Sequence, residues 1–186
     1  MKRALCMTID IEANRRTEKW SRREKLGRLL WEVAHPLFAW SPRLAWGWRR
    51  GLLRAFGAKI GSEAHIYPSV RIAIPWNVHI GAFSAVGDNA HLYSLGRITI
   101  GANATISQGA HLCAGTHDFR DPQMPLLKLP ITIGAGAWVA ADAFVGPNVK
   151  VGDRSVVGAR GVVVRDVPQD VVVAGNPARI VGHRNE

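Results

Sequence analysis

An aliphatic residue returns every six positions through the C-terminal half of the chain. The clearest run is Ile133, Val139, Val145, Val151, Val157 and Val163. The fifth position of each of these hexads is small or β-branched, as at Ala137, Ala143, Val149, Ser155, Gly161 and Val167. An amphipathic helix gives spacings of three and four, and a half-buried strand gives a spacing of two, so a period of six fits neither.

A period of six is typical of a solenoid. Each hexad would form one short strand and one corner, and three hexads would form one triangular coil that stacks on the next at about 4.8 Å. The aliphatic side chains would point into a continuous core, and the fifth position would be small because that core is narrow. We expect the glycines that follow many of the aliphatic residues, such as Gly134 and Gly152, to serve tight corners where φ is positive.

The same register can be followed back to residue 60. The first face begins at Ile60, Ile80, Ile100, Ile133 and Val151, the second at Ile66, Val86, Ile106, Val139 and Val157, and the third at Ile72, Leu92, Leu112, Val145 and Val163. The first two coils each need 20 residues instead of 18, which predicts a two-residue bulge near the last corner of each. We therefore expect an all-β solenoid, a parallel β-helix of about five coils, over residues 60–168, followed by a tail over 169–186.

One long break interrupts the repeat. The third coil is regular through His117, and the pattern resumes only at Ile133, which leaves an excursion over residues 118–132. Loops of this length inside a compact domain are usually functional, because the solenoid itself gains nothing from them. The break therefore marks the candidate site, and it begins directly after a histidine.

The first 59 residues differ in composition from the repeat. Residues 1–60 contain 14 Lys and Arg against 5 Asp and Glu, and they hold five of the seven tryptophans. Leu26, Leu29, Leu30, Val33 and Leu37 follow helical spacing and predict an amphipathic helix over 21–40, which Pro36 interrupts, with a second helix over 44–56. This segment either caps the open end of the solenoid or docks on an anionic membrane surface. Nucleic acid is a poor alternative, because no recognition motif accompanies the charge.

The remaining composition favours a cytoplasmic protein, with the inner membrane surface as a candidate contact. Two cysteines, Cys6 and Cys113, lie far apart in sequence and form no disulfide framework. The N-terminus carries charges and no apolar run typical of a secretory signal, and no stretch approaches the ~20 apolar residues of a membrane span.

The hexad pattern resembles that of the hexapeptide-repeat acyltransferases. The runs 130–134 (PITIG), 138–141 (WVAA) and 157–159 (VGA), with the closing 174–179 (AGNPAR), are similar to sugar O-acetyltransferases of this family. The segment 106–118 (ISQGAHLCAGTHD), with 48–50 (WRR) and 56–61 (FGAKIG), resembles the narrower colanic acid biosynthesis acetyltransferase group. The resemblance covers residues 25–184 and is specific for acyl transfer, whereas the hexads alone specify only the fold.

The resemblance implies a left-handed β-helix, a homotrimer and active sites between subunits. It also implies acetyl-CoA as co-substrate and a saccharide hydroxyl as acceptor, in exopolysaccharide or surface-glycan biosynthesis. His117 matches the catalytic histidine by its position at the end of a coil and the start of the loop. A histidine suits a general base because its pKa lies near working pH, and the reaction needs neither a metal nor a protein nucleophile.

The resemblance also suggests residues for the acceptor. Asn89 lies close to the position of an acceptor-binding asparagine, and Asp118 could bind sugar hydroxyls, orient His117 or cap the loop. His91 and His111 occupy the sixth position of successive hexads on the second face and should stack one coil apart. They form either a polar ladder at a corner or a contact with the sugar.

Five positions match the CoA site of the family: Trp138, Ala141, Ala159, Arg165 and Arg179. Small residues let the pantetheine arm lie flat against the coils, and the two arginines could pair with phosphates. Arg179 could equally be a solvated residue of the tail. Where relatives often carry Ser, Thr and Lys, this chain has Ala141, Val164 and Arg165, which puts some side-chain hydrogen bonds to CoA in doubt.

Two other functions are compatible with the same fold. One is a zinc enzyme of the γ-carbonic anhydrase type, for which His111 and His117 are candidate ligands, although the closer histidine pair and the acidic residue of that family are missing. The other is a non-catalytic β-helix scaffold, which would have no need of the loop that follows His117.

Overall fold

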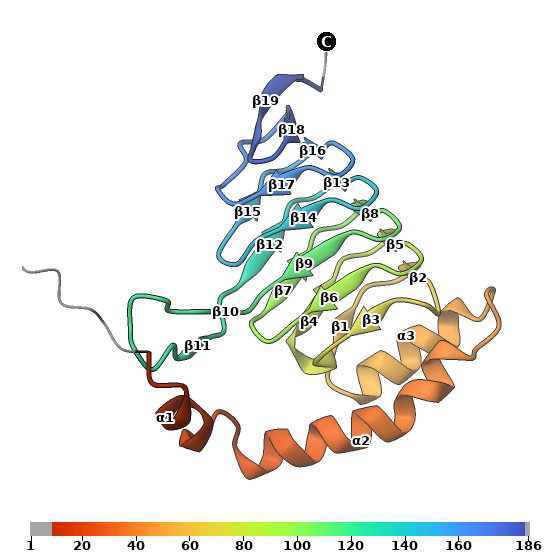
Figure 1. Cartoon of the computed structure of the whole chain (residues 1–186). Helices are drawn as coiled ribbons and strands as arrows, with labels where there is room; N and C mark the ends of the chain where they lie inside the picture. Colours follow the sequence, from red (N-terminus) through yellow and green to blue (C-terminus); the bar gives the residue numbers. More distant parts are fainter. Residues whose placement is uncertain (1–8, 185–186) are drawn as a thin grey trace, which may run out of the picture.

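The computed structural model describes residues 9–184 and shows a triangular stack of parallel strands above a layer of helices (Figure 1). The first sheet contains β1 (Lys59–Ile60), β4 (Val78–Ile80), β7 (Ile98–Ile100), β12 (Ile131–Ile133) and β15 (Lys150–Val151). The second contains β2 (His65–Ile66), β5 (Ala85–Val86), β8 (Thr105–Ile106), β13 (Trp138–Val139), β16 (Val156–Val157), β18 (Val171–Gly175) and β19 (Ala178–His183). The third contains β3 (Arg71–Ile72), β6 (His91–Tyr93), β9 (His111–Cys113), β14 (Phe144–Val145) and β17 (Val162–Val163).

The register of the hexads matches the register of the sheets. Ile80 pairs with Ile60 on one side and with Ile100 on the other, and Ile133 pairs with Ile100 and Val151. These residues are buried, as are their counterparts on the other two faces. The six-residue period thus predicts both which strands are neighbours and which side chains fill the core.

The solenoid has about six turns rather than five. β18 adds a sixth parallel strand to the second sheet by pairing with β16, and Val167 bridges to Val151 in the first. β19 then folds back antiparallel onto β18. The regular structure therefore continues past residue 168 into the segment expected to be a tail. The last turn is incomplete, which explains why the hexads alone suggest five coils.

Most corners do not use glycine, contrary to the expectation from the sequence. The left-handed conformation is adopted mainly by other residues, among them Asn89, Asn103, Asp142 and Arg160, whose φ angles lie between 56° and 57°. The glycines that follow the aliphatic residues have a different role. A Cβ on Gly81, for example, would collide with the backbone of Ala102 in the next coil. The small residue is required by the close stacking of coils rather than by backbone conformation.

The basic N-terminal segment covers the open end of the solenoid. It forms α1 (Ile11–Arg16), α2 (Arg22–Ala39) and α3 (Trp46–Ala55), and the bulge of the first coil forms the short helix η1 (Pro75–Asn77). α2 begins at a capping box in which Ser21 and Glu24 exchange hydrogen bonds, and it continues past Pro36, so the expected interruption is wrong. Pro36 lies in the last turn, and the helix continues past it, since its carbonyl accepts from the backbone N–H of Trp40 at 2.9 Å.

Side chains of this segment donate hydrogen bonds to carbonyls of the first coil on all three faces. Trp31 Nε1 donates to the carbonyl oxygen of Ile72 at 2.8 Å, and Arg49 Nε donates to that of Ile66 at 2.6 Å. Arg54 donates to the carbonyl oxygen of Ile60 at 2.7 and 3.0 Å. A β-helix must satisfy the unpaired carbonyls of its first coil, because no strand precedes them. The segment therefore acts as a cap.

The leucine-rich face of α2 points away from the solenoid. The buried face of the helix carries Trp31 and Phe38, whereas Leu26, Leu29, Leu30, Val33 and Leu37 are all exposed. The helical spacing was predicted correctly, and the structure shows that the leucines lie on the exposed face while Trp31 and Phe38 pack on the core. No helix within residues 9–184 is long and apolar enough to cross a membrane.

Candidate active site

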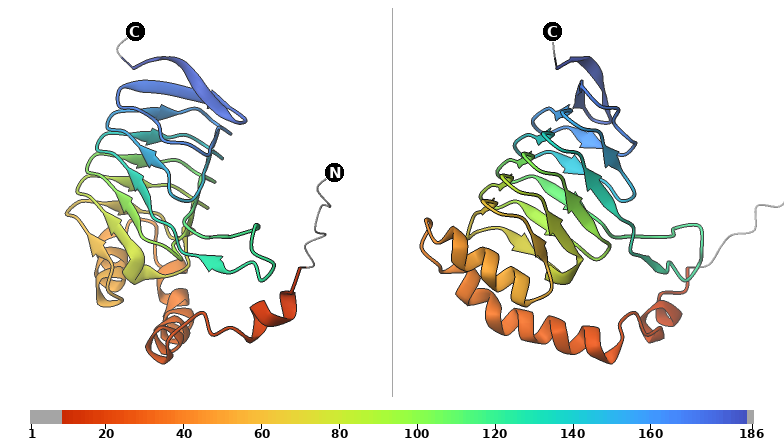
Figure 2. Two further views of the ribbon diagram at one scale, coloured as in Figure 1. Left: turned by 90° about the vertical axis from the view of Figure 1, so that its left-hand side faces the viewer. Right: turned by 180° about the vertical axis from the view of Figure 1, so that it is seen from behind.

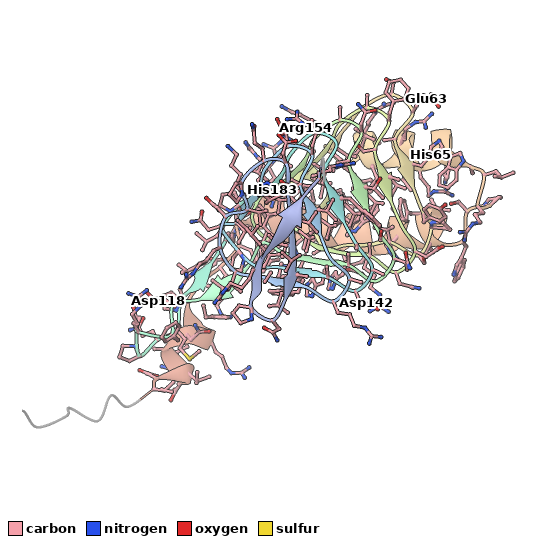
Figure 3. All side chains as sticks on the ribbon, turned by 90° about the horizontal axis from the view of Figure 1, so that it is seen from above. Glu63, His65, Asp118, Asp142, Arg154 and His183 are labelled. Atoms are coloured by element: carbon pink, nitrogen blue, oxygen red, sulfur yellow. The ribbon has the colours of Figure 1, made fainter. Side chains whose placement is uncertain are left out.

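His117 lies on a hairpin that projects sideways from the third coil. The hairpin pairs β10 (Thr116–His117) antiparallel with β11 (Leu126–Leu127), and His117 faces Leu126 across it. The chain rejoins the stack at Ile131, which is buried and pairs with Ile98. The excursion therefore ends before residue 131, whereas the prediction extended it to residue 132. Viewed along the stack, Asp118 lies well outside the triangle of coils (Figure 3).

A backbone carbonyl fixes the orientation of the His117 ring. Nδ1 of His117 lies 2.6 Å from the carbonyl oxygen of Met124, on the opposite side of the hairpin. A carbonyl only accepts hydrogen bonds, so Nδ1 carries the proton in this contact. In the neutral ring the lone pair is then on Nε2, which is the arrangement that a general base needs.

The N-terminal arm, residues 9–21, holds the same carbonyl from the other side. Nδ2 of Asn14 on α1 donates to the carbonyl oxygens of Met124 at 2.7 Å and Gln123 at 2.6 Å. Nζ of Lys19 donates to Oδ1 of Asn14 at 2.6 Å, which orients the amide. Asn14 is buried although α1 is otherwise mostly exposed. The carbonyl that orients His117 is thus itself held by a side chain about a hundred residues away in sequence.

Lys128 ties the return strand of the hairpin to the arm as well. Its ammonium lies 3.7 Å from the ring centroid of Trp20, donates to the carbonyl oxygen of Lys19 at 3.0 Å and lies 3.7 Å from Oε1 of Glu24. Figure 2 shows the hairpin extending from the stack toward α1. The return side of the hairpin is therefore held at two points, by Asn14 before β11 and by Lys128 after it.

Asp118 caps the turn of the hairpin. Its Oδ1 accepts from the backbone N–H of Arg120 at 3.0 Å, and its own N–H donates to the carbonyl of Pro125. The orientation of His117 comes from Met124 instead. Of the three roles considered for Asp118, the structure shows the loop-capping contact, and a contact with the acceptor stays a prediction.

His91 and His111 stack as the register predicted, but they lie on the third sheet, in β6 and β9, just after the corner. Their ring centroids are 4.6 Å apart at 11°, and Phe144 packs edge-on against His111 at 5.4 Å. Burial lowers the pKa of both rings, with Arg71 adding to the effect at His91 and His91 at His111. Nε2 of His111 is buried and has no hydrogen-bond partner within residues 9–184.

Asn89 occupies the exposed corner that precedes His91. Its backbone is left-handed, with φ at 57°, and its N–H donates to Oγ of Ser69 at 3.0 Å. Asparagine tolerates this conformation well, so a corner role accounts for the residue. In the described part of the chain no contact brings Asn89, His91 or His111 to His117.

The residues matched to the CoA site fall into two groups. Ala141 and Ala159 lie on successive corners, joined by the hydrogen bond from Arg160 N–H to the Ala141 carbonyl at 2.9 Å. Trp138, on the strand before that corner, is about half exposed and donates to Oγ of Ser107 at 2.8 Å. Arg165 and Arg179 line one hollow at the C-terminal end of the stack. The structure therefore places Ala141, Ala159 and Trp138 in one region and Arg165 and Arg179 in another, and it does not bring all five residues together.

Two contributors were not identified from the sequence. Met124 acts through its carbonyl, and a backbone group has no signature in a residue pattern. Asn14 lies outside the repeat, in a segment without periodicity, so only the tertiary contact reveals it. Among residues 9–184 no group of three or more His, Cys, Asp or Glu side chains is arranged to hold a metal ion.

Known proteins resemble this chain in both sequence and structure, although no protein-family model matches it. It is 47% identical over 159 residues to the Escherichia coli (strain K12) protein named as colanic acid biosynthesis acetyltransferase WcaF, covering 86% of this chain and 87% of the relative. A galactoside acetyltransferase in complex with coenzyme A has a TM-score of 0.82 and 28% identity, covering 94% of this chain and 89% of that one.

A hexapeptide-repeat acetyltransferase of Vibrio cholerae O1 biovar eltor, complexed with acetyl coenzyme A, also has a TM-score of 0.82, with 25% identity over 91% of this chain and 93% of that one. These neighbours are left-handed β-helices, which confirms the predicted fold class. Acetyltransferase relatives and CoA-bound neighbours leave no support for the carbonic anhydrase and scaffold alternatives. The chain is an acyltransferase that belongs to the hexapeptide-repeat acetyltransferases, within their colanic acid biosynthesis group.

Proposed function

We propose that this enzyme transfers an acetyl group from acetyl-CoA to a sugar hydroxyl during exopolysaccharide or surface-glycan biosynthesis. The observation that carries the proposal is the contact between His117 Nδ1 and the Met124 carbonyl, because it leaves Nε2 available to accept a proton. The CoA-bound neighbours and the relative named for colanic acid biosynthesis support the donor and the class of acceptor.

His117 would act as base and then as acid in one direct transfer. Nε2 takes the proton of the acceptor hydroxyl as its oxygen attacks the thioester carbonyl, and a tetrahedral oxyanion forms. When this intermediate collapses, the carbon–sulfur bond breaks, and the imidazolium returns the proton to the CoA sulfur. The products are the acetyl ester and free CoA, so no protein nucleophile is needed. The Met124 carbonyl also stabilises the imidazolium by accepting its Nδ1 proton.

The stacked corners offer a surface for the donor. Ala141 and Ala159 leave the backbone of two successive coils open to a flat pantetheine arm, and Trp138 lies beside them. Arg165 and Arg179 would pair with phosphates from the hollow that they line. Val164, which is exposed and lines the same hollow, would supply packing where a hydroxyl would donate.

A site formed between two subunits would bring the separated residues together. Within one chain, His117 projects on the hairpin, while Asn89, His91 and His111 remain on the coils. A homotrimer would bring the hairpin of one subunit to the coils of the next, where Asn89, the histidine pair and Asp118 could contact the sugar. Light scattering on the purified protein tests the trimer.

We place the enzyme in the cytoplasm, where acetyl-CoA is made, with its basic N-terminal segment in contact with the inner membrane surface. Residues 1–60 hold 14 Lys and Arg against 5 Asp and Glu, and this positive balance favours anionic lipids as neighbours.

An acceptor screen with acetyl-CoA tests the proposed reaction. Free thiol release is measured for a panel of soluble sugars and oligosaccharides, with His117→Ala as the blank. Product mass must show one added acetyl group, and NMR then assigns the hydroxyl. Transfer to amines only, or release that persists in His117→Ala, would contradict the proposal.

A further inference from the structure

The outer face of α2 carries a continuous apolar stripe, formed by Leu26, Leu29, Leu30, Val33, Leu37 and Trp40. These residues recur at helical spacing, so they line one side of the helix. The side chain of Val33 is 72% exposed and that of Trp40 is 85% exposed. Trp31 and Phe38, which pack on the solenoid, lie on the opposite side of the helix. The stripe is therefore additional to the surface that the fold uses.

The stripe continues beyond the end of α2. Leu44, in the connection to α3, is 82% exposed, and Trp48 on α3 is 52% exposed. A shallow apolar hollow lies here, lined by Pro36, Leu37, Trp40, Pro42 and Trp48. Tryptophan favours the boundary between hydrocarbon and water, because its ring is apolar while its N–H is polar.

Charge at the edges of the stripe complements an anionic surface. Arg22 and Arg23 are exposed in the first turn of α2. Lys25 and Arg43 are exposed as well, but they already pair with Glu18 and Asp88. Glu32 is the opposing carboxylate on the exposed side of the helix. Other arginines, such as Arg49 and Arg54, are occupied in capping the first coil. Pairing with a second copy through this face would bring two basic segments together, which disfavours self-association.

The position of α2 suits contact with a flat surface. The helix lies across the base of the stack, on the side away from the coils, and its 18 residues extend about 27 Å (Figures 1 and 2). It is not apolar enough to span a bilayer. An amphipathic helix with a basic margin lies in the plane of a membrane, with its apolar side in the headgroup boundary.

We infer that the α2 stripe is a membrane-docking surface that inserts into the interface of an anionic bilayer. This inference specifies the membrane contact of the proposed function. The helix places the arm, and through Asn14 and Lys128 the catalytic hairpin, on the side of the molecule nearest the lipid. An acceptor carried on a lipid would then meet the active site without leaving the membrane.

Vesicle co-sedimentation of the full chain tests the surface. Vesicles of phosphatidylcholine with phosphatidylglycerol are compared with vesicles of phosphatidylcholine alone. We expect binding to the anionic vesicles and at least a roughly tenfold loss of affinity in Leu29→Ser/Val33→Ser. The matched control is Ile180→Ser/Val181→Ser, which removes two exposed aliphatic side chains at the other end of the solenoid and should bind as the parent does. Circular dichroism verifies that both variants fold.

A second variant separates charge from apolar insertion. Arg22→Gln/Arg23→Gln should weaken binding to anionic vesicles several-fold and lower its salt dependence, while the serine variant loses affinity at every salt concentration. Absence of binding by the parent protein at low salt overturns the inference, and so does equal binding by the serine variant. If the serine variant instead lowers the oligomeric state in light scattering, the stripe is a contact between copies.

The proposed docking surface and the proposed reaction are tested independently of each other. Turnover of a soluble acceptor without vesicles measures the acetyl transfer, and sedimentation without acceptor measures the docking.

Discussion

The third coil carries two histidines in opposite environments. His111 lies on the solenoid, stacked on His91 and packed by Phe144, with a ring nitrogen that has no partner in the described chain. His117, six residues later, is exposed on the hairpin and is held by one carbonyl. Burial lowers the pKa of the first ring, because it disfavours the charged form. Exposure of the second leaves its ring accessible to a substrate. The solenoid thus supplies a rigid frame, and the hairpin carries the candidate base.

The largest expected effect comes from removing His117, the histidine of the hairpin. We expect His117→Ala to lower kcat/KM by about 10²- to 10⁴-fold, the usual contribution of a general base. Thiol release with acetyl-CoA and a sugar acceptor measures the loss, and calorimetry should show unchanged CoA affinity. His183→Ala, a change of another exposed histidine on β19, serves as the control. A loss within tenfold in His117→Ala would remove the base role.

The support of the hairpin can be tested at Asn14. Asn14→Asp replaces the amide donor by a carboxylate that faces two carbonyl oxygens, so it should repel the strand that orients His117. We expect kcat to fall about tenfold with little change in KM for acetyl-CoA, and Asn14→Ala to lose less. The control is Glu12→Gln on the same helix, which removes only an exposed ion pair. An equal effect of Asp and Ala would show that the repulsion is irrelevant.

The solenoid side of the comparison is tested at the two arginines of the C-terminal hollow. Arg165→Gln and Arg179→Gln should each raise KM for acetyl-CoA about 3- to 10-fold and leave kcat nearly unchanged, because they would bind phosphates remote from the reacting atoms. Initial rates at varied acetyl-CoA measure this. Arg97→Gln, an exposed arginine between coils two and three, is the matched control. A fall in kcat at constant KM for acetyl-CoA would contradict the phosphate-binding role and would show that the two arginines act in the transfer step.

The smallest expected effect is a pH dependence of stability from the stacked pair. Their folded pKa values lie below the ordinary value of about 6.5, so the unfolded chain binds more protons than the folded chain as pH falls below about 7. Stability present at neutral pH is therefore lost as pH falls through this window. The Tm of His91→Phe/His111→Phe should fall a few degrees less than that of the parent between pH 7 and pH 5, as measured by calorimetry. An equal change of Tm with pH in the variant and the parent would contradict this account.

Much of the fold could be predicted because each coil contacts only its neighbours. A period of six places Ile80 between Ile60 and Ile100 without any knowledge of distant segments. His117 could be found for a related reason, since it is the last residue before the repeat breaks. Corner conformation was harder to predict, because Asn89 and Arg160 adopt positive φ without being glycine, whereas Gly81 is required by the backbone of the next coil.

The amino-acid sequence by itself determined the repeat, its register, the candidate base and the helical form of the N-terminal segment. Each of these follows from local spacing. Only the tertiary structure decided which face of α2 packs on the coils, and which groups orient His117. The first depends on Trp31 and Phe38 fitting the open end of the solenoid while the leucines remain outside. The second depends on Asn14 meeting the backbone of Met124, and a contact between a side chain and a distant carbonyl leaves no period in the sequence.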